Sequence, residues 1–334
     1  MNNKSSTEIV QSLVLKAKKA QSIFENFNQN QVDEIVTAVA WAICKPSNNE
    51  KISNLAVDIT GLGNANDKIL KNRRKTLGLL RDLKEIKTVG IINEDKEKGI
   101  IEIAKPVGVV AAVTPSTNPA ATPINNIINA LKTRNSIIVS PSPAGSKVFI
   151  DLLVLINIEL KKVGAPKNLI QTFDCDVTKE LTNELMQNVD LLIVTGSLNN
   201  VKQAAKSGTK AIGVGQGNVT SIVDETADLK DAFKKIKMSK TFDNATSCSS
   251  ENNLILIEDV YEKSINLLSK ENAVLLNKDQ KKVLQKNLWL DGKLNRKIIA
   301  KSAKFISKEL NLKVTEDVQI LMVEEDGVGS DYPF

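Results

Sequence analysis

Predicted strands and helices alternate along the middle of this 334-residue chain, and this alternation constrains the fold more than any other feature. The run from Val107 to Val113 is almost wholly apolar, as in a strand buried on both faces of a sheet. Four further apolar segments follow, each separated from the next by a helical segment, at residues 136–139, 169–173, 191–194 and 211–214. Strands that alternate with helices form parallel sheets with helices on both faces. The sequence therefore predicts an α/β fold built on a parallel sheet.

The segments before this region extend the first domain, and those after it indicate a second domain. Helical periodicity predicts two helices within residues 7–44 and further helices at 50–60 and 68–83, the last with a solvated outer face of lysine and arginine. Residues 88–105 predict a β-hairpin, and a contact between subunits is one way to cover its edges. Beyond residue 220 we expect helices at 231–238, 260–271, 278–286 and 298–307 and strands at 254–257 and 318–323. We therefore expect one domain over residues 1–220 and another over 221–334.

Small, polar and glycine residues follow the predicted strands of the sheet. In open parallel sheets, ligands bind beyond the carboxyl ends of the strands, where small side chains let a phosphate or ribose approach the backbone and helix N-termini offer N–H groups. These positions favour a nucleotide site. The GxGxG at Gly213 is not the Rossmann fingerprint, and it fits a structural turn as well as a cofactor loop. The candidate cofactor-binding residues are Thr114, Pro115, Ser140, Ser142, Gly196, Ser197, Gly213 and Val214.

Cys248 lies among small polar residues just ahead of the apolar run 254–257. A thiol on a turn before a buried strand can reach a ligand while the core holds its backbone. A lone cysteine is more often a small buried hydrophobe, and Cys44 and Cys175 are interpreted as structural. The chain has no histidine, which excludes Cys-His and Ser-His-Asp catalysis within it. A thiolate would need backbone N–H groups, a helix N-terminus or a positive charge instead.

Composition limits the compartment and the classes of partner that the chain can have. The three cysteines are far apart and not in CxxC spacing, which argues against a disulfide framework or a zinc site and for free thiols in the cytoplasm. The net charge is +6, but lysines alternate with acidic residues and aromatics are only 4% of the chain, so we expect a solvated surface and no nucleic-acid groove. The N-terminus lacks the apolar core of a signal peptide, and no apolar stretch is long enough to span a membrane.

Four stretches together carry a resemblance to a known family. They are PVGVVAAVTPSTN at residues 106–118, NALKTRNSIIV at 129–139, KAIGVGQGN at 210–218 and KTFDNATSCSSE at 240–251. In this order and spacing they resemble the CoA-acylating branch of the aldehyde dehydrogenase superfamily, over nearly the whole chain. That branch includes the aldehyde domain of bifunctional aldehyde–alcohol dehydrogenases. Blocks at residues 41–46 and 60–64 resemble acylating sulfoacetaldehyde dehydrogenases.

The resemblance implies a fold and a chemistry. It implies an aldehyde-dehydrogenase-like fold with a cofactor domain and a catalytic domain, NAD or NADP as hydride acceptor, and coenzyme A as co-substrate. The family nucleophile falls on Cys248, the oxyanion-binding asparagine on Asn118, and a Gly-Ser at the nicotinamide on Gly196 and Ser197. Cys248 would form a thiohemiacetal with an aldehyde, and hydride transfer would leave a thioester on the cysteine.

One departure within the superfamily bears on the second half-reaction. Hydrolytic members resemble Glu-Leu-Gly-Gly where this chain reads Gly213-Val214-Gly215-Gln216, and their glutamate is the base that activates water. Without that base, water is a poor attacker of the thioester, so acyl transfer to the CoA thiol is expected. The alternative is that another carboxylate, such as Glu251, acts as the base and gives hydrolysis to the free acid.

Other expectations concern the substrate and the extent of the chain. Sulfoacetaldehyde is the aldehyde that the resemblance favours, with acetaldehyde and propionaldehyde left open. Family chains continue past a position like Tyr332-Pro333-Phe334, so the resemblance implies a catalytic domain that is incomplete, as in a chain truncated at its C-terminus. An inactive nucleotide-binding fragment is therefore an alternative reading. The hairpin favours a homo-oligomer.

Overall fold

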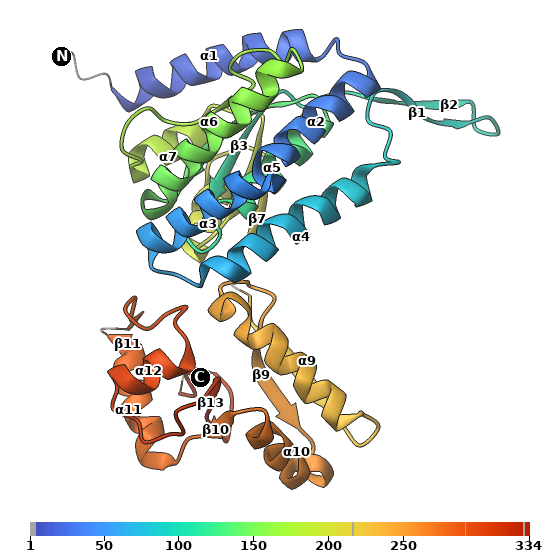
Figure 1. Cartoon of the computed structure of the whole chain (residues 1–334). Coiled ribbons are helices and arrows are strands. Elements are labelled where there is room, and N and C mark those ends of the chain that lie inside the picture. The colour runs from blue at the N-terminus through green and yellow to red at the C-terminus, as the bar shows by residue number, and fades with distance from the viewer. Residues whose placement is uncertain (1–4, 216, 291, 330) are drawn as a thin grey trace. The chain divides into compact units, whose positions relative to one another are not determined.

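The computed structural model describes residues 5–215, 217–290, 292–329 and 331–334. Residues 1–4 at the expected leaderless N-terminus, and Gln216 of the glycine-rich block, lie outside the described residues. The chain divides into two compact units (Figure 1). One comprises Met1–Gly61 and Lys68–Gln216, and the other comprises Leu62–Asp67 and Gly217–Phe334.

The first unit contains a five-stranded sheet in the order β5-β4-β3-β6-β7, with every neighbouring pair parallel. The chain runs outward from β3 through β4 to β5 and then returns to β6 and β7 on the other side, so the strand order reverses between β3 and β6. All residues of β3 and β4 are buried, as expected for central parallel strands. The predicted parallel sheet is confirmed. The strands are β3 (Val109–Thr114), β4 (Ser136–Pro141), β5 (Ile170–Gln171), β6 (Leu191–Thr195) and β7 (Ala211–Val214).

Helices cover both faces of this sheet (Figure 1). Val110 and Ala112 of β3 pack into a core with α2 (Gln29–Cys44), α3 (Pro46–Thr60), α5 (Ala121–Lys132) and α6 (Ser146–Lys162). Their neighbours Val109, Ala111 and Val113 pack into a second core with α1 (Ser6–Phe24) and α7 (Lys179–Gln187), to which α8 (Leu198–Lys206) adds Ala204. Successive strand residues point to opposite faces, so β3 fills both cores.

Helix α4 (Ala65–Leu83) departs from the expectation that its basic side chains are all solvated. Lys75 is exposed, but Lys68 and Lys71 are only 4% and 3% exposed. The buried face of this helix is polar throughout, comprising Lys68, Lys71, Asn72 and Thr76. Lysine is almost never buried without a polar partner, so the buried lysines need hydrogen bonds, whereas Leu79, Leu80 and Leu83 further along the helix pack against the apolar core.

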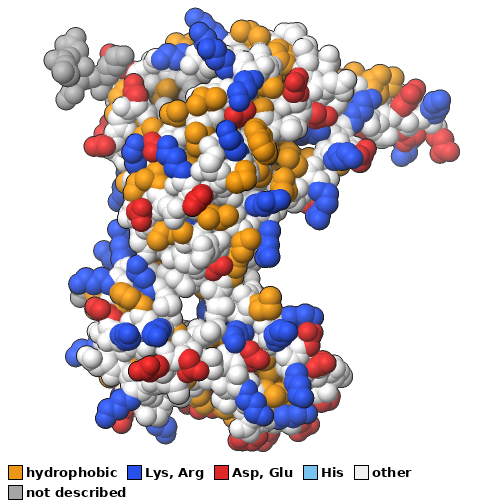
Figure 2. All heavy atoms as spheres, in the orientation of Figure 1, with side chains coloured by type: hydrophobic (Ala, Val, Ile, Leu, Met, Phe, Trp, Pro, Cys, Tyr) orange, Lys and Arg blue, Asp and Glu red, His pale blue; other side chains and the backbone are white. Residues whose placement is uncertain are grey.

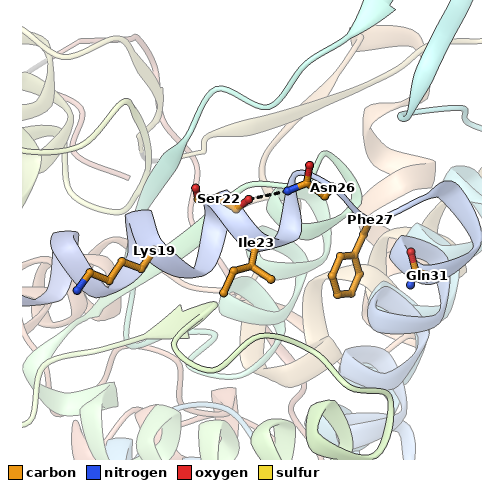
Figure 3. Close-up of a pocket in the computed structure, with 6 residues that line it drawn as sticks. All are labelled: Lys19, Ser22, Ile23, Asn26, Phe27 and Gln31. Carbon is orange, nitrogen blue, oxygen red and sulfur yellow. Dashed lines mark hydrogen bonds between the residues drawn. The ribbon is translucent and has the colours of Figure 1, made fainter.

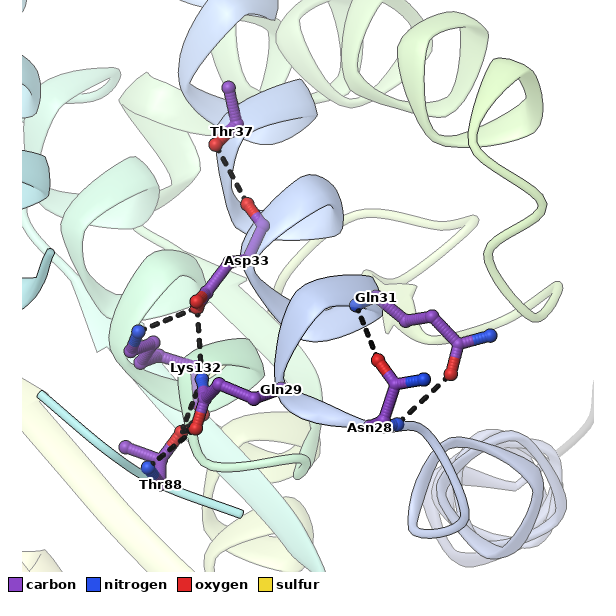
Figure 4. Close-up of polar contacts among 7 residues, drawn as sticks. All are labelled: Asn28, Gln29, Gln31, Asp33, Thr37, Thr88 and Lys132. Atoms are coloured by element: carbon purple, nitrogen blue, oxygen red, sulfur yellow. Dashed lines mark hydrogen bonds and ion pairs between the residues drawn. The ribbon is translucent and has the colours of Figure 1, made fainter. Parts of the chain in front are cut away.

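The predicted hairpin is confirmed as β1 (Gly90–Asp95) paired with β2 (Ile100–Ala104). A polar network fixes its base (Figure 4). Thr88, just before β1, donates two hydrogen bonds to helices. Its N–H donates to Oε1 of Gln29 on α2 at 2.8 Å, and its hydroxyl donates to the carbonyl of Lys132 on α5 at 2.5 Å. The buried ammonium of Lys132 lies 2.5 Å from the carboxylate of Asp33 on α2. The hairpin is thus anchored to two helices while its isoleucines are exposed.

The second unit is built around two short parallel pairs. Strand β8 (Val219–Val223) pairs with β9 (Glu251–Leu256), and β10 (Ala273–Leu275) pairs with β13 (Ile320–Met322). A core around Phe233 and Leu268 packs helix α9 (Leu229–Thr241) and helix α10 (Glu258–Lys270) onto these strands. The remaining elements are the 3₁₀ turns η1 (Pro143–Gly145, in the first unit) and η2 (Phe242–Ala245), helices α11 (Lys278–Leu288) and α12 (Ala303–Glu309), and the two-residue strands β11 (Trp289–Leu290) and β12 (Lys293–Leu294).

Three sequence expectations need correction here. The pattern did not predict β8, β10, β11 or β12, which are short or carry polar residues. The helix expected at 298–307 begins only at Ala303. The strand expected to be buried at 254–257 is β9, which begins at Glu251 and is half-buried, with Ile255 exposed. Strands on small two-stranded sheets have few covering neighbours, so their apolar pattern is weak.

The described residues contain neither a membrane-spanning helix nor a cluster of metal-ligating side chains. Among the helices described, none has the length and apolar character needed to cross a bilayer. The same residues contain no group of three or more His, Cys, Asp or Glu side chains placed to hold a metal ion. Lysine and arginine side chains are interspersed with acidic ones on the face shown in Figure 2.

Candidate functional site

The register of the sheet brings the predicted cofactor residues of the first unit to one edge. Thr114 at the end of β3 pairs with Pro141 at the end of β4, and Thr195 at the end of β6 pairs with Val214 at the end of β7. Thr114 ends β3 and Gly196 follows β6, and these are the two strands between which the order reverses. In open α/β sheets that reversal is where ligands bind.

The hydroxyl of Thr114 is an orphaned polar group at this edge. The residue is 2% exposed, and its Oγ1 has no hydrogen-bond partner among the described residues. Buried polar atoms without a partner are rare in folded proteins and mark positions where a ligand or water supplies one. This observation fits a nucleotide at the end of β3.

Ser140 within β4 and Ser142 just after it are both engaged within the fold. Ser140 is buried, with its Oγ 3.0 Å from the hydroxyl of Thr182 on α7. The Oγ of Ser142 accepts a hydrogen bond from the N–H of Gly145 at 3.2 Å and caps η1. A Cβ at Gly145 would lie 3.2 Å from the Cβ of Pro119, so the loops after β3 and β4 pack tightly against each other. Gly145 was missed by sequence reasoning, although it directly follows the Ser-Pro-Ser-Pro-Ala segment.

The residues after β6 and β7 also contact one another. The N–H of Gly196 donates to the carbonyl of Val214 at 3.1 Å. Ser197 is the N-cap of α8, where its Oγ accepts from the N–H of Asn200 at 3.3 Å. A Cβ at Gly213 would lie 2.8 Å from Cγ1 of Val201 on α8. Glycine at 213 therefore has a structural reason, because any side chain would press on this helix.

Asn118 lies in the loop between β3 and α5, where two lysines of α4 hold it. Its Oδ1 accepts a hydrogen bond from Nζ of Lys71 at 2.9 Å. The carbonyl of the preceding residue, Thr117, accepts from Nζ of Lys68 at 3.3 Å. The sequence had placed these lysines on a solvated face. Their i, i+3 spacing, which puts them on the same side of the helix, was the one available sign that they act together.

In the second unit, Cys248 is exposed at a turn, closed by a hydrogen bond from the N–H of Ser250 to the carbonyl of Ser247 at 3.1 Å. Strand β9 begins immediately afterwards. The turn-before-strand placement expected from the sequence is thus observed. The alternative that Cys248 is a small buried hydrophobe is not, since the residue is exposed.

The other two cysteines have different surroundings. Cys44 is half-buried, and burial raises the pKa of its thiol, an effect that the charge of Arg73 partly offsets. Cys175 is exposed, and desolvation followed by the charges of Asp174 and Asp176 raises the pKa of its thiol. A raised pKa leaves less thiolate at neutral pH, so neither site favours a nucleophile.

The Cys248 turn follows a strained backbone segment that Asp243 stabilises. Asp243, Asn244 and Ala245 have φ values of 50°, 49° and 57°, in the left-handed region that non-glycine residues seldom adopt. The Asp243 side chain is fully buried and accepts hydrogen bonds from the N–H of Asn64 at 2.9 Å and the hydroxyl of Thr246 at 2.5 Å. Sequence reasoning quoted this aspartate within the family block without assigning it a role.

A close backbone contact shapes the turn further. A Cβ at Gly217 would lie 2.1 Å from the carbonyl oxygen of Cys248 and 2.9 Å from its Cβ. Contacts below 3.0 Å to backbone atoms require something to move, so only glycine fits at 217 beside this turn. The last glycine of GxGxG therefore acts as a structural close-approach residue against the cysteine.

Glu251, the alternative general base, opens β9 three residues after Cys248. One of its carboxylate oxygens, Oε2, is buried and has no hydrogen-bond partner among the described residues. Burial lowers the pKa of Lys240, and the charge of Glu251 partly offsets this shift. Nζ of Lys240 donates to Oδ1 of Asn252 at 3.1 Å. The charges of Glu251 and Lys240 therefore influence each other, while the hydrogen bond of Lys240 goes to Asn252.

A separate hollow of about 770 Å³ lies on the surface where α1 ends and α2 begins (Figure 3). Its lining includes Lys19, Ile23 and Gln31, all exposed, and none of the predicted site residues. The hollow therefore adds nothing to the candidate site at the strand ends.

The comparison with known families agrees with the fold and these sequence blocks. The profile of the aldehyde dehydrogenase family matches residues 2–285. The chain belongs to the aldehyde dehydrogenase family, which confirms the resemblance found in the sequence.

Individual relatives narrow the class to CoA-acylating enzymes. The chain is 50% identical over 329 residues to the acylating sulfoacetaldehyde dehydrogenase of Cupriavidus necator, covering 98% of this chain and 67% of that protein. It is 36% identical to the bifunctional aldehyde-alcohol dehydrogenase of Escherichia coli, covering 97% of this chain and 36% of that protein. The chain thus spans about two thirds of the length of the sulfoacetaldehyde dehydrogenase.

Two solved structures support the same class. An acetylating aldehyde dehydrogenase from Geobacillus thermoglucosidasius matches with a TM-score of 0.94 at 37% identity, covering 98% of this chain and 72% of that chain. A propionaldehyde dehydrogenase from Rhodopseudomonas palustris was solved with CoA and an acylated cysteine. It matches with a TM-score of 0.83 at 30% identity, covering 94% of this chain and 72% of that chain.

Proposed function

We propose that this chain carries the cofactor-binding sheet and the nucleophile of a CoA-acylating aldehyde dehydrogenase, which oxidises a small aldehyde to an acyl-CoA. The observation that carries the proposal is the exposed thiol of Cys248, held on a turn within a chain that is 50% identical to an acylating sulfoacetaldehyde dehydrogenase. The relative solved with CoA and an acylated cysteine supports the same chemistry.

In the first half-reaction, the Cys248 thiolate adds to the aldehyde carbon and forms a thiohemiacetal. The carbonyl oxygen becomes an oxyanion, for which the family resemblance assigns the Asn118 amide and the Cys248 backbone N–H as hydrogen-bond donors. Such donors are worth several kcal/mol when they are aimed at a developing charge, about 3 kcal/mol for one donor. Loss of hydride from the thiohemiacetal then leaves a thioester on Cys248.

The edge of the parallel sheet supplies the groups that would hold NAD or NADP, and the nicotinamide supplies the hydride acceptor when it is bound. The hydroxyl of Thr114, which has no partner among the residues described, and the backbone around Pro115 flank one side of the reversal in strand order. Gly196 and Ser197 flank the other side. Ser140, Ser142, Gly213 and Val214 shape the edge, mainly through contacts within the fold.

In the second half-reaction, the CoA thiol attacks the thioester and releases the Cys248 thiolate. Gly213 offers no carboxylate, and a side chain there would press on Val201. Activation of water by a base at this position is therefore excluded, which favours acyl transfer to CoA over hydrolysis.

Sulfoacetaldehyde is the proposed substrate, because the sulfoacetaldehyde dehydrogenase of Cupriavidus necator shares half of its aligned residues with this chain. Acetaldehyde and propionaldehyde are the competing candidates, since relatives named for acetylating and propionaldehyde activities share the fold. A homo-oligomer is proposed because the hairpin exposes several isoleucines. The cytoplasmic location stays a prediction from the sequence.

The test is a small panel of aldehydes incubated with the protein, NAD or NADP, and CoA, with products identified by mass spectrometry. The expected result is formation of acyl-CoA and NADH or NADPH that requires CoA and is lost in Cys248→Ala, with sulfoacetaldehyde turned over best. Free acid formed without CoA would indicate a hydrolytic enzyme. Nucleotide binding with no thioester at Cys248 would indicate a silent binding subunit.

A further inference from the structure

We infer that Lys71 is a positioning residue for Asn118, and that its ammonium fixes the amide so that Oδ1 faces Lys71 and Nδ2 is the hydrogen-bond-donating end. The inference rests on the proposed function, because it assigns Asn118 the oxyanion role described above. It adds to that function a role for the buried ammonium of Lys71 on α4, which the sequence pattern had placed on a solvated surface.

The direction of the hydrogen bond carries the first step. Nζ of Lys71 lies 2.9 Å from Oδ1 of Asn118. An ammonium group has donors and no acceptor, whereas an asparagine amide has one acceptor end and one donor end. A flipped amide would set donor against donor, so Lys71 selects the orientation with Oδ1 toward itself. The NH₂ group of Asn118 then points away from Lys71, as an oxyanion donor must.

Burial makes this selection strong. Lys71 is 3% exposed and Asn118 is half-buried, so water competes little for either group. Hydrogen bonds to a charged group are roughly twice as strong as neutral ones, and low local dielectric strengthens them further. An ammonium acting on Oδ1 also polarises the amide, which makes its N–H groups better donors.

The helix that carries Lys71 is itself fixed by polar contacts. Nδ2 of the adjacent Asn72 donates to Oδ1 of Asn49 at 3.0 Å and to Oγ of Ser53 at 3.1 Å, both on α3. Nδ2 of Asn49 donates back to the carbonyl of Ile69 on α4 at 2.9 Å. These reciprocal bonds set the rotation and register of α4 against α3, and so they aim Lys71.

A second lysine on the same face holds the backbone beside Asn118. Nζ of Lys68, three residues before Lys71, donates to the carbonyl of Thr117 at 3.3 Å. Helix α4 therefore secures both the main chain and the side chain of this loop. If this face of α4 were solvated, both ammonium groups would lie in water. Instead Lys68 and Lys71 bind two adjacent residues of one loop, Thr117 and Asn118.

The step that reports this role is acylation of Cys248 by acetyl-CoA, the reverse of acyl release. The Cys248 thiolate forms a bond to the acetyl carbon, and the carbonyl π electrons move to oxygen to give the oxyanion. Collapse of that intermediate restores the carbonyl and expels the CoA thiolate. Alkylation of the same thiolate by iodoacetamide displaces iodide directly and develops no oxyanion.

The experiment measures both rates on the Cys248 peptide by mass spectrometry in the full protein. Lys71→Met removes the donor while keeping the length of the side chain, Lys71→Arg keeps charge and donors, and Lys75→Met is the matched control on an exposed position of α4. In Lys71→Met we expect acetylation to slow about 10- to 100-fold, below the loss for a deleted oxyanion donor, with alkylation unchanged. Lys71→Arg should retain acetylation within about threefold and Lys75→Met should match the parent protein.

Several outcomes would overturn the inference while leaving the proposed function standing. One is wild-type acetylation in Lys71→Met when Asn118→Ala is slow. Another is an equal slowing of acetylation and alkylation in Lys71→Met, which would indicate a general structural role. Should Lys71→Met fail to fold, slowed acetylation with normal alkylation in a folded Lys71→Gln, together with retained acetylation in Lys71→Arg, supports the inference, and unchanged acetylation in Lys71→Gln contradicts it. If the parent protein is acylated at Cys248 neither by acetyl-CoA nor by sulfoacetyl-CoA, the proposed function itself fails.

Discussion

The buried carboxylate of Asp243 accepts a hydrogen bond at 2.9 Å from the backbone N–H of Asn64, a residue 179 positions earlier in the chain. The N–H of Asp243 in turn donates to the carboxylate of Asp67 at 2.7 Å. These reciprocal contacts join the short segment Leu62–Asp67 to the rest of the second unit, a few residues ahead of Cys248. The hydrogen bonds of Asp243 with Asn64 and Asp67, which we call the polar lock, therefore hold the backbone that leads to the proposed nucleophile.

Replacing Asp243 with asparagine tests this lock. Asparagine tolerates the left-handed φ of 50° at this position, so the change removes the charge without adding backbone strain. We expect the free energy of unfolding to fall by about 1–3 kcal/mol, because buried donors lose a charged acceptor. Denaturant unfolding measures the loss, and iodoacetamide alkylation of Cys248 is expected to change rate because its turn loosens.

The control for Asp243→Asn is Asp317→Asn at an exposed position of the same unit, which should alter stability by no more than about 0.5 kcal/mol. Equal stability of the two variants would show that the carboxylate contributes nothing beyond its shape. In that case the lock would depend on the backbone contacts alone.

Much of the fold was predictable from the sequence because its signals are local. The apolar run that became β3 is buried on both faces, and glycine at 61 ends α3 in the left-handed conformation expected of a helix C-cap. The parallel order of the sheet followed from the alternation of strands with helices. The short strands β10 to β12 could not be predicted, because two or three residues carry too little periodicity.

The candidate site was predictable only in part. Cys248 and Asn118 stand in recognisable blocks, and the structure puts Cys248 on an exposed turn. The partners of these blocks could not be inferred, because Lys71 reaches Asn118 across 47 residues and Asn64 reaches Asp243 across 179. Contacts over such separations leave no periodic signal, and a lysine on a helix has the same pattern whether it is solvated or buried.

Ala245 offers a test of the backbone strain ahead of Cys248. Its φ of 57° is unfavourable for alanine and neutral for glycine. Ala245→Gly should therefore be more stable than Ala232→Gly, a change within helix α9, by about 1–2 kcal/mol in denaturant unfolding. Both variants share the entropy that glycine adds to the unfolded chain, so their difference isolates the strain. An equal loss of stability in both would mean that alanine at 245 is unstrained.

Gly217 and Gly215 form a matched pair for testing the close approach to Cys248. A Cβ at 217 would overlap the Cys248 carbonyl oxygen, whereas no atom of the described residues lies within 4 Å of a Cβ at 215. Gly217→Ala should lower the free energy of unfolding by about 1–3 kcal/mol and slow acetylation of Cys248 by acetyl-CoA, because the turn must shift. Gly215→Ala should do neither. Acetylation at the parent rate in Gly217→Ala would show that the turn moves without consequence.

The last prediction concerns the missing base at Gly213. A glutamate there would press its Cβ on Val201, 2.8 Å away, so Gly213→Glu alone should lose about 1–3 kcal/mol of stability. Adding Val201→Ala removes the obstructing methyl groups, and we expect the double variant to regain stability relative to the single one. If the absence of a carboxylate at 213 disfavours hydrolysis, the double variant should also form free acid without CoA, as measured by product mass spectrometry. Gly213→Gln with Val201→Ala is the matched control, since glutamine has the same shape and cannot act as a base. Free acid from the glutamine variant, or none from the glutamate variant once it is stably folded, would show that position 213 does not select between water and CoA.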